Sequence, residues 1–465
     1  MTDGTRDNPH TLAIARFVSG LTAEQIPQAV RERIKLLILD SLGCALYGAH
    51  LEWSKILQKT LADIDCSQAA TVWGTHLRMS LPHAALINGS QIQGFELDDV
   101  HRQGVMHVGA VVLPGLLGIA QSKRAMSGRE FLAAATAGYE VGPRVGLCMG
   151  PEHIAQGWHS GATLGVFSAA AAAARGLGLD VSQTVHALGI AGTQASGLMA
   201  AQYGAMVKRM HAGRAAQSGL YGALLAEQGF TGIENVLESE YGGFCTTFSR
   251  SQDRFDLAQL TLGFGSVWQT MRIALKFYSC VGSNHTTLDA IRLLQAQRPF
   301  GANDVKEVLV SGSQVTMDHV GWRYRPDGLT AAQLNLPYCV ATLLLDGECF
   351  VDQFTQEKVA DPQRMALAER VHVAHDDQIT ARGSKYRHMV HVKVELLDGT
   401  LLQTSVEAPR GSEDNFANQD QIARKFELLA GKVLGPERTR ALRDAVLGLE
   451  NMDDVGQLLV LMTPH

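Results

Sequence analysis

Side chains suited to proton transfer and anion binding gather in a few short segments of this 465-residue chain. The first segment, residues 95–107, holds three carboxylates and two histidines: Glu96, Asp98, Asp99, His101 and His107. A histidine tuned by a neighbouring carboxylate is the group that a general base near neutral pH requires. The carboxylates of this segment could equally cap a helix or hold a loop. A metal site is a weaker interpretation, because the segment has no His-x-x-x-His or His-Glu-x-x-His pair.

Two further segments carry basic side chains. His159 precedes an alanine-rich stretch at 161–174, where the start of a helix would offer N–H groups to an anion, although a packing histidine is an equal interpretation. Lys208, His211 and Arg214 are three apart in sequence and would share one face of a helix. In a chain of net charge −6, this basic face is a candidate clamp for carboxylates, and a solvated surface is the alternative.

Two polar segments, residues 276–285 and 319–326, lie beside apolar stretches and could edge a cleft, but neither identifies a chemistry by itself. The sequence contains no Gly-x-Gly-x-x-Gly turn, no P-loop and no Gly-x-Ser-x-Gly elbow. Dinucleotide-dependent redox chemistry and phosphoryl transfer are therefore disfavoured.

The elements that must position these side chains change character along the chain. Up to about residue 265 the apolar residues follow a helical period, with windows at 24–47, 82–97, 113–123, 128–147, 161–177, 181–190 and 208–228. After residue 300 the period becomes two, which predicts strands near 305–311, 389–397 and 400–406. A hairpin turn is expected at 397–400, and helices are expected at 330–345, 420–434 and 436–447.

This order predicts a mainly α fold with an α+β insertion that contains a short antiparallel sheet. We expect a large helical domain made of residues 1–268 and 408–465, with a smaller α+β domain at 269–407 between them. Two helical windows also carry glycine at every fourth position: Gly138, Gly142 and Gly146, and then Gly157, Gly161 and Gly165. Glycine costs about 1 kcal/mol relative to alanine inside a helix. Close helix packing is the favoured reason for it, and a closely approaching ligand is the alternative.

Composition narrows the class of protein further. Apolar residues make up 46% and charged residues 18% of the chain, which excludes an intrinsically disordered protein. The net charge of −6 disfavours a protein that holds nucleic acid by its overall charge. The longest apolar stretches are too short to span a bilayer, and the first residues lack the apolar core of a secretory signal. Seven scattered cysteines without a Cys-x-x-Cys pair argue against a disulfide framework and a zinc ribbon. We predict a cytoplasmic protein with no nucleic-acid or membrane partner.

The segments described above resemble, in their order, the MmgE/PrpD family, which includes 2-methylcitrate dehydratase, cis-aconitate decarboxylase and iminodisuccinate epimerase. The matching stretches in the first half are Asn88-Gly, Phe-Glu-Leu-Asp-Asp99, His107-x-Gly, Val112-Leu-Pro-Gly, Gly138-Tyr-Glu-Val and His159 followed by Gly165. Those in the second half are Lys208-x-x-His-x-Gly-x-Ala-Ala216, Gly229-Phe-Thr-Gly-Ile, Tyr241-Gly-Gly-Phe, Lys276-x-Tyr-x-Cys, His285 and Leu344-Leu-Asp-Gly. The resemblance covers nearly the whole chain.

The resemblance implies a helical domain with a smaller α+β lid, a homodimer, no metal and no organic cofactor. It implies an active cleft between the domains, lined by residues that match His107, His159 and Lys208. Glu96 matches an acidic position that is aspartate in the decarboxylases of the family. Three further positions differ from those decarboxylases, which have threonine at Val100, histidine at Val281 and tyrosine at Trp322, with Tyr324 as a nearby substitute.

We therefore predict catalytic roles for His107, His159, Lys208 and Glu96. The predicted substrate-binding residues are Asp99, His211, His285, Trp322 and Tyr324. Lys208, with His211 nearby, is expected to hold a carboxylate and the charge that develops on it. His107 and His159 are expected to act as acid and base, with Glu96 or Asp99 orienting an imidazole.

The reactions of this family share the making or quenching of a carbanion beside a carboxylate, which fixed positive charge can stabilise. The predicted function is that of a lyase that removes water or carbon dioxide from a small di- or tricarboxylate. An epimerase of an amino or imino dicarboxylate is the nearest alternative, since two bases on opposite faces of one carbon need the same residues. A helical protein that binds a ligand without catalysis is the alternative of another class.

Overall fold

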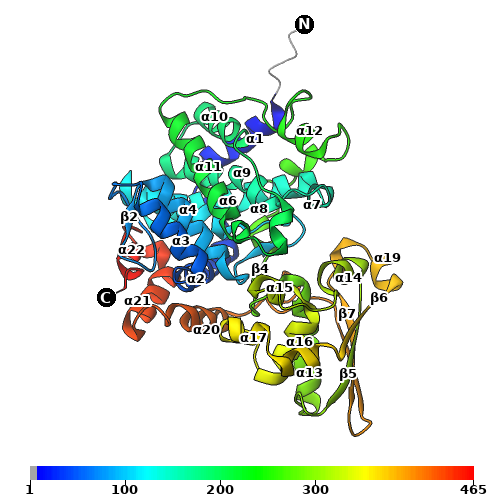
Figure 1. Cartoon of the computed structure of the whole chain (residues 1–465). Helices are drawn as coiled ribbons and strands as arrows, with labels where there is room; N and C mark the ends of the chain where they lie inside the picture. Colours follow the sequence, from blue (N-terminus) through cyan, green and yellow to red (C-terminus); the bar gives the residue numbers. More distant parts are fainter. Residues whose placement is uncertain (1–7, 465) are drawn as a thin grey trace.

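Helices form most of the computed structural model, which describes residues 8–464. The longer helices of the first half are α1 (Pro9–Gly20), α2 (Gln28–Gly48), α3 (Glu52–Ala62), α4 (Leu81–Ile92), α5 (Gly109–Ser122), α6 (Gly128–Met149), α9 (Gly165–Leu177), α10 (Val181–Gly192) and α11 (His211–Glu227). Figure 1 shows these helices gathered in its upper part, with a sheet and further helices below them to the right. The prediction of a mainly α chain with an α+β part is thereby confirmed, whereas the domain borders stay a prediction.

The alanine-rich helix α9 lies at the centre of these helices, where it packs against α5, α6, α10 and α11. Its alanines at 169–174 are all buried, and their small side chains let the neighbouring helices approach closely. On α6, a Cβ added to Gly138 or Gly142 would come within 3.0 Å of atoms of Ser168 in α9. Close packing against α9 therefore explains Gly138 and Gly142, whereas Gly146 lies against the loop backbone at Gly104.

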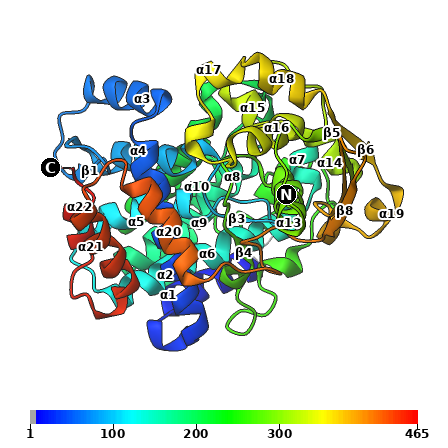
Figure 2. The same cartoon turned by 90° about the horizontal axis from the view of Figure 1, so that it is seen from below.

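The chain returns to the helical part at its end. The last helices are α20 (Gln419–Ala430), α21 (Pro436–Leu447) and α22 (Gln457–Leu461). Helix α20 packs along α2, as Figure 2 shows from below. Lys425 Nζ of α20 lies 2.6 Å from Asp40 Oδ1 of α2 and donates to the Leu97 carbonyl at 2.6 Å, and both charged side chains are buried. This contact ties the end of the chain to the segment that carries Glu96 and Asp98.

The α+β part runs from α13 to β8, and the rest of the described chain is called the helical part. Its main elements are α13 (Gly282–Gln297), β5 (Val305–Gly312), α14 (Gln314–Val320), α15 (Leu329–Leu334), α16 (Leu336–Asp346), α18 (Pro362–Ala368), β6 (Val371–His375), β7 (Val390–Leu396) and β8 (Leu401–Val406). The four strands form one sheet in the order β6-β5-β7-β8. The pairs β5–β7 and β7–β8 are antiparallel, but β5 and β6 are parallel, so the expectation of a purely antiparallel sheet is wrong. Strand β6 spans only five residues after α18, too few for a clear period-two pattern.

Three predicted helices are interrupted at places that matter for the site. The predicted window 82–97 ends at Ile92, and a 3₁₀ turn, η2 (Gln93–Phe95), follows it. Lys208 lies in another 3₁₀ turn, η4 (Met206–Met210), because α11 begins only at His211. The window 330–345 splits into α15 and α16 at Asn335, whose side chain caps α16 by accepting from the Tyr338 N–H at 2.8 Å.

Among residues 8–464, no single helix is both long and apolar enough to cross a membrane.

Candidate active site

A carboxylate surrounded by positive charge forms the centre of the site. Glu96 follows η2 with a φ of 59°, which is uncommon for a residue with a side chain and is often retained at functional sites. Its Oε1 accepts hydrogen bonds from the Lys208 ammonium and, at 2.8 Å, from Arg209 Nη1. Its Oε2 accepts from Lys276 Nζ at 3.3 Å. We call these four buried residues, Glu96, Lys208, Arg209 and Lys276, the Glu96 cluster.

Strand pairing brings distant parts of the chain into this cluster. The short strand β3 (Val100–His101) pairs with β4 (Ile273–Ala274), so the loop after Glu96 lies beside the segment that carries Lys276. Lys208 and Arg209 arrive from η4, which contacts both α4 and η2. The cluster therefore forms only when three segments, more than 60 residues apart in sequence, fold together.

The charges of the cluster shift one another's pKa. Burial works against ionisation of Glu96, but Lys208, Lys276 and Arg209 outweigh it and hold the Glu96 pKa well below its usual range. Burial also opposes the charge on Lys276, yet Glu96 and Asp98 raise its pKa. For Lys208, burial prevails over the attraction of Glu96 and lowers the pKa. Lys208 is thus the lysine of the cluster that more readily gives up a proton.

Positive charge exceeds negative charge around this point. The three cations face two carboxylates, Glu96 and Asp98, and Asp98 Oδ1 lies 3.8 Å from Lys276 Nζ. Both carboxylates are buried, so solvent screens the excess charge only weakly. The arrangement favours an anionic guest and the negative charge that develops on it during a reaction.

His107 forms a dyad with Asp98. His107 Nδ1 lies 2.8 Å from Asp98 Oδ2, and the carboxylate is completely buried. An ionised carboxylate can only accept, so Nδ1 carries the hydrogen and Nε2 is left for exchange with a substrate. The sequence predicts Glu96 or Asp99 as the carboxylate that orients an imidazole, whereas in the structure Asp98 contacts His107.

Asp99 is occupied by the backbone of helix α5. Its oxygens accept from the Val108 N–H at 3.2 Å and from the Gly109 N–H at 2.9 Å and 3.2 Å. Burial raises the pKa of Asp99 to about 7, and the neighbouring Asp98 adds to this shift. Asp99 therefore caps the start of α5, and its predicted role in substrate binding stays a prediction. Tyr139, which packs beside it, is likewise completely buried in the core.

Two further imidazoles stand beside the cluster. The rings of His159 and His211 meet edge to face with their centroids 4.4 Å apart. A Cβ on Gly161 would lie 3.3 Å from His159 Cε1 and 4.0 Å from His107 Cδ2, so this glycine lies between the two predicted acid–base histidines. Burial lowers the pKa of His159 well below its usual range and that of His211 to about 4, and Lys208 contributes to both shifts. Both rings are neutral near pH 7.

The α+β part contacts the cluster directly. Arg209 Nη2 donates to Thr330 Oγ1 at 3.1 Å and to Gln333 Oε1 at 3.0 Å, both in α15. The amide nitrogen of Gln333 donates in turn to the Phe95 carbonyl at 3.2 Å. Arg209 thus binds Glu96 and the α+β part together, and the site lies where the two parts meet.

Four residues named from the sequence are placed elsewhere. Arg214 is exposed on α11 and bonds to Gln217. His285 is buried in the α+β part, with Nε2 3.1 Å from the Cys280 carbonyl. The Tyr324 hydroxyl donates to the Val359 carbonyl at 2.8 Å, and the Trp322 indole donates to the His319 carbonyl at 3.3 Å. In this structure His285 Nε2 and the Tyr324 hydroxyl thus bond to backbone carbonyls, and the substrate-binding roles predicted for both residues stay predictions. Trp322 lies at the end of α14, beside His319.

Sequence reasoning also missed residues that belong to the site. Asp98, Arg209 and Lys276 lie within segments that drew attention, but none was assigned a role. Arg209 adjoins Lys208, and the helical spacing that linked Lys208 with His211 and Arg214 gave no reason to include it. The 3₁₀ geometry of η4 turns both Lys208 and Arg209 towards Glu96. A search for several cations around one buried carboxylate could have found the set.

A group of three thiols has the composition of a metal site. The buried sulfur atoms of Cys280, just before α13, and of Cys339 and Cys349 in the α+β part lie within 4.8 Å of one another. The Asn284 amide donates to the Cys339 sulfur at 3.3 Å, and apolar side chains surround the group. We interpret these cysteines as packing residues. The separate prediction that the reaction needs no metal stays a prediction.

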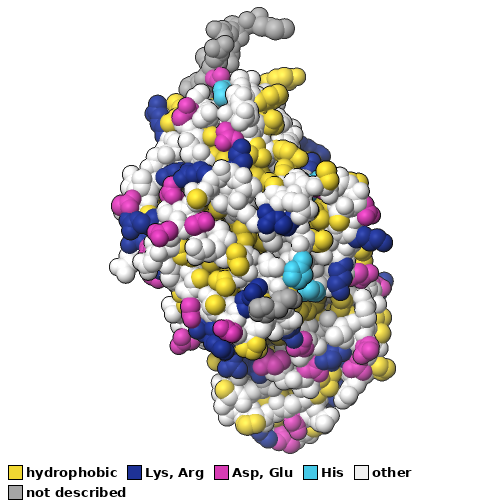
Figure 3. Space-filling view, turned by 90° about the vertical axis from the view of Figure 1, so that its left-hand side faces the viewer, with side chains coloured by type: hydrophobic (Ala, Val, Ile, Leu, Met, Phe, Trp, Pro, Cys, Tyr) yellow, Lys and Arg dark blue, Asp and Glu magenta, His cyan; other side chains and the backbone are white. Residues whose placement is uncertain are grey.

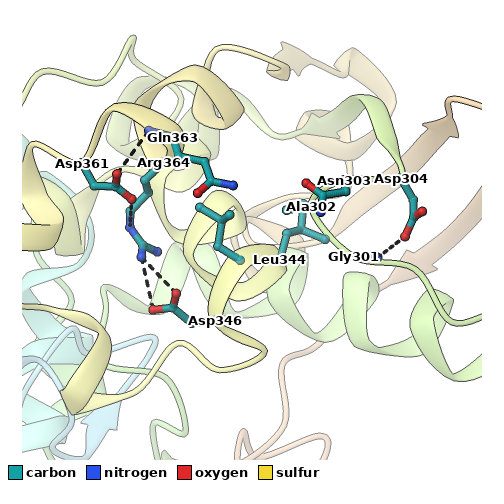
Figure 4. A pocket seen from close by; sticks show the side chains of 10 residues that line it. Gly301, Ala302, Asn303, Asp304, Leu344, Asp346, Asp361, Gln363 and Arg364 are labelled. Atoms are coloured by element: carbon teal, nitrogen blue, oxygen red, sulfur yellow. Dashed lines mark hydrogen bonds and ion pairs between the residues drawn. The ribbon is translucent and has the colours of Figure 1, made fainter.

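A surface pocket of about 450 Å³ lies on the α+β part, and no residue of the Glu96 cluster lines it. Figure 4 shows its Arg364 directed at Asp346, with Asp361 on the other side of the guanidinium. The lining holds three carboxylates, Asp304, Asp346 and Asp361, and one guanidinium, so the pocket has no excess positive charge like that of the Glu96 cluster.

Comparisons with known proteins agree with the resemblance. Residues 12–256 match the MmgE/PrpD N-terminal domain and residues 278–451 match the MmgE/PrpD C-terminal domain. A cis-aconitate decarboxylase-like protein of Aspergillus oryzae, oryM, is 36% identical over 482 residues, which cover 100% of this chain and 99% of that protein. The cis-aconitate decarboxylase of Aspergillus terreus is 35% identical, over 97% of this chain and 95% of its own length. That of Mus musculus is 26% identical, over 97% and 93%.

Proposed function

Because the chain belongs to the MmgE/PrpD family and is an enzyme of the lyase and decarboxylase kind, we propose that it removes carbon dioxide from cis-aconitate or a closely similar unsaturated tricarboxylate. The single observation that carries the choice of an anionic substrate is the excess positive charge of the buried Glu96 cluster beside three histidines. The names of the fungal relatives support decarboxylation over loss of water or epimerisation.

The chemical step leaves an electron pair on the substrate, and this negative charge must be stabilised. When the bond to the departing carboxylate breaks, its two electrons remain on the substrate carbon and spread through the double bond onto a second carboxyl group. The ammonium of Lys208 stabilises that charge in surroundings that solvent screens weakly. Glu96 holds Lys208, Arg209 and Lys276 in place and limits their mutual repulsion.

A proton must then reach carbon. Two groups are suited to deliver it: Lys208, whose pKa is lowered by burial, and His107, whose ring is held by Asp98 at 2.8 Å. His159, whose pKa is held well below its usual range by burial, is neutral and can accept a proton from the substrate. One proton enters the product for each carbon dioxide that leaves, and the enzyme returns to its starting charge when solvent replaces that proton. A positioned acid of this kind contributes about 10²–10⁴ in rate.

The three reaction types can be separated in one experiment. The enzyme is incubated in deuterated water with cis-aconitate, citrate, 2-methylcitrate and aspartate-type dicarboxylates, and proton and carbon NMR follow each acid. We expect cis-aconitate to lose carbon dioxide and to gain one deuterium on carbon. New vinyl signals from a hydroxy acid would replace the proposal with a dehydratase, and exchange without net change would replace it with an epimerase.

We also propose, on the resemblance, that the enzyme is a homodimer. Figure 3 shows hydrophobic side chains in several places on the face of the helical part that it presents. The exposed residues at the end of α11 and just after it include Tyr221, Leu225, Phe230 and Ile233. Light scattering coupled to gel filtration should give about twice the chain mass of 50.1 kDa. A monomer at micromolar concentration would refute the dimer without affecting the proposed reaction.

A further inference from the structure

A chain of hydrogen bonds in the α+β part ends on a histidine that has no role so far. Ser283, in the first turn of α13, has its hydroxyl 3.1 Å from His319 Nδ1 and 3.3 Å from His388 Nε2. Ser283 and His388 are buried, and His319, in α14, is partly exposed. Among the side chains that the structure describes, His319 Nε2 has no hydrogen-bond partner.

Side-chain hydrogen bonds from α13 and from α14 hold the backbone at His388 and at the residue before it. The Thr286 hydroxyl of α13 donates to the His388 carbonyl at 2.6 Å. From α14, the Thr316 hydroxyl donates to the Arg387 carbonyl at 3.0 Å. The arrangement of Ser283, His319 and His388 is thus part of the folded structure and does not depend on one flexible side chain.

We call Ser283, His319 and His388 the relay. It lies between two contacts that join the α+β part to the helical part. On one side, the Val281 N–H donates to the Gln333 carbonyl at 3.1 Å, and the Gln333 side chain bonds to Arg209 of the Glu96 cluster. On the other side, Arg387 Nη2 donates to the Arg102 carbonyl at 2.7 Å, within the loop between Asp98 and His107. His319 therefore stands at the seam where the site is formed.

The charges that act on His319 agree with this placement. Burial lowers the pKa of His319, Lys208 and Arg387 lower it further, and Glu96 acts in the opposite sense. The pKa of His388 is also lowered, by burial first and then by Arg387. Both imidazoles are therefore neutral near pH 7, so each carries its single hydrogen on one ring nitrogen only.

We propose that His319 is a substrate-binding residue supplied by the α+β part, and that Ser283 and His388 position it by fixing its tautomer. A serine hydroxyl has one hydrogen to donate. If His388 Nε2–H donates to Ser283, the Ser283 hydroxyl donates to His319 Nδ1, and the hydrogen of His319 stays on Nε2. The free edge of His319 is then a hydrogen-bond donor, which suits a carboxylate. The inference rests on the proposed function, because it takes an anionic substrate as the guest.

Two substitutions at one position test the donor. The amide nitrogen of glutamine lies near the place of Nε2, and that of asparagine lies near the place of Nδ1. We expect His319→Gln to keep kcat/KM within about threefold of the wild type. We expect His319→Asn to lower it about 10- to 100-fold, mostly through KM, as for loss of one hydrogen bond to a charged group. His372→Gln is the matched control, because His372 is an exposed histidine of strand β6. Equal loss, or no loss, in both His319 variants would overturn the substrate-binding role.

A second comparison tests the relay. Ser283→Ala should lower kcat/KM about three- to tenfold in the wild type but should have no further effect in His319→Gln, because glutamine has no tautomers. The same penalty in both backgrounds would show that Ser283 acts only on the fold. Ring nitrogen-15 NMR of histidine-labelled protein, assigned with His319→Gln, should show His319 as the Nε2–H tautomer and a mixed population in Ser283→Ala. This spectrum needs no substrate, so it decides on the relay even if the wild type turns over no acid of the panel.

Discussion

Replacing Lys425 with methionine should lower the free energy of unfolding by about 3–5 kcal/mol, the cost of leaving a buried charge without its partner. Lys425 Nζ lies 2.6 Å from Asp40 Oδ1, and both side chains are at most 3% exposed. The methionine side chain has a similar length and is apolar, so lost packing contributes little. The expected loss comes from Asp40 and from the Leu97 carbonyl, which also loses its donor.

The double variant Asp40→Asn/Lys425→Met is the control. Removing both charges also removes the desolvation cost of the pair, so the double variant should recover most of the lost stability. Urea unfolding followed by circular dichroism measures all three differences, provided that the slopes agree. A single variant within 1 kcal/mol of the wild type, or a double variant no more stable than the single one, would refute this reasoning.

The same pair predicts a dependence on pH. Burial raises the pKa of Asp40, although Lys425 acts against this shift. An acid with a raised folded-state pKa contributes most stability below its unfolded pKa and loses that contribution as the pH rises through the folded pKa. Without Lys425 the Asp40 pKa rises further, so the deficit of Lys425→Met should shrink as the pH is lowered from about 8 to about 5. A deficit that is constant over this range would mean that Asp40 stays ionised.

Three further predictions concern the site and its support. Asp98→Asn should lower kcat about 10²- to 10⁴-fold, because His107 loses the carboxylate that orients its ring; steady-state kinetics checks this. Gly142→Ala should cost about 1–3 kcal/mol, because its Cβ would come within 2.7 Å of Met106 and Ser168, as thermal unfolding would show. Since burial lowers the pKa of His211 to about 4, its contribution to stability is present above pH 6.5 and is lost as the pH falls towards 4. The unfolding free energy of His211→Gln should therefore fall less steeply over that range.

Periodic patterns in the sequence were enough for most of the fold. Helices such as α6 and α10 begin and end within two residues of the predicted windows, because a capping box fixes each start. The parallel strand β6 was missed, since its neighbour β5 is about 60 residues away in sequence and no local signal records the pairing. The breaks at Glu96, Lys208 and Asn335 were missed for a related reason. Near Glu96 and Lys208 the tertiary contact between these two side chains accompanies the break, and at Asn335 the side chain caps a new helix by accepting from the Tyr338 N–H.

The candidate site was predicted in part. His107, His159, His211, Lys208 and Glu96 do come together, and these are residues whose types alone suggest chemistry. The partners of these residues were harder to foresee. Asp98 and Asp99 are adjacent acids that differ only in direction: one faces an imidazole and the other a helix start. Sequence spacing cannot distinguish two such neighbours in a loop, because the backbone path decides which way each side chain points.

The Glu96 carboxylate competes with an incoming substrate for the cations of the site. An incoming acid must draw the ammonium and guanidinium groups away from Glu96, which already satisfies them. Small buffer anions offer one charge and few contacts, so they should seldom displace Glu96 from the cations. Acetate or chloride should therefore inhibit weakly. A substrate with several carboxylates offers more charge and more contacts. In the proposed reaction one of these carboxylates leaves as carbon dioxide, so the product should bind more weakly and dissociate more easily.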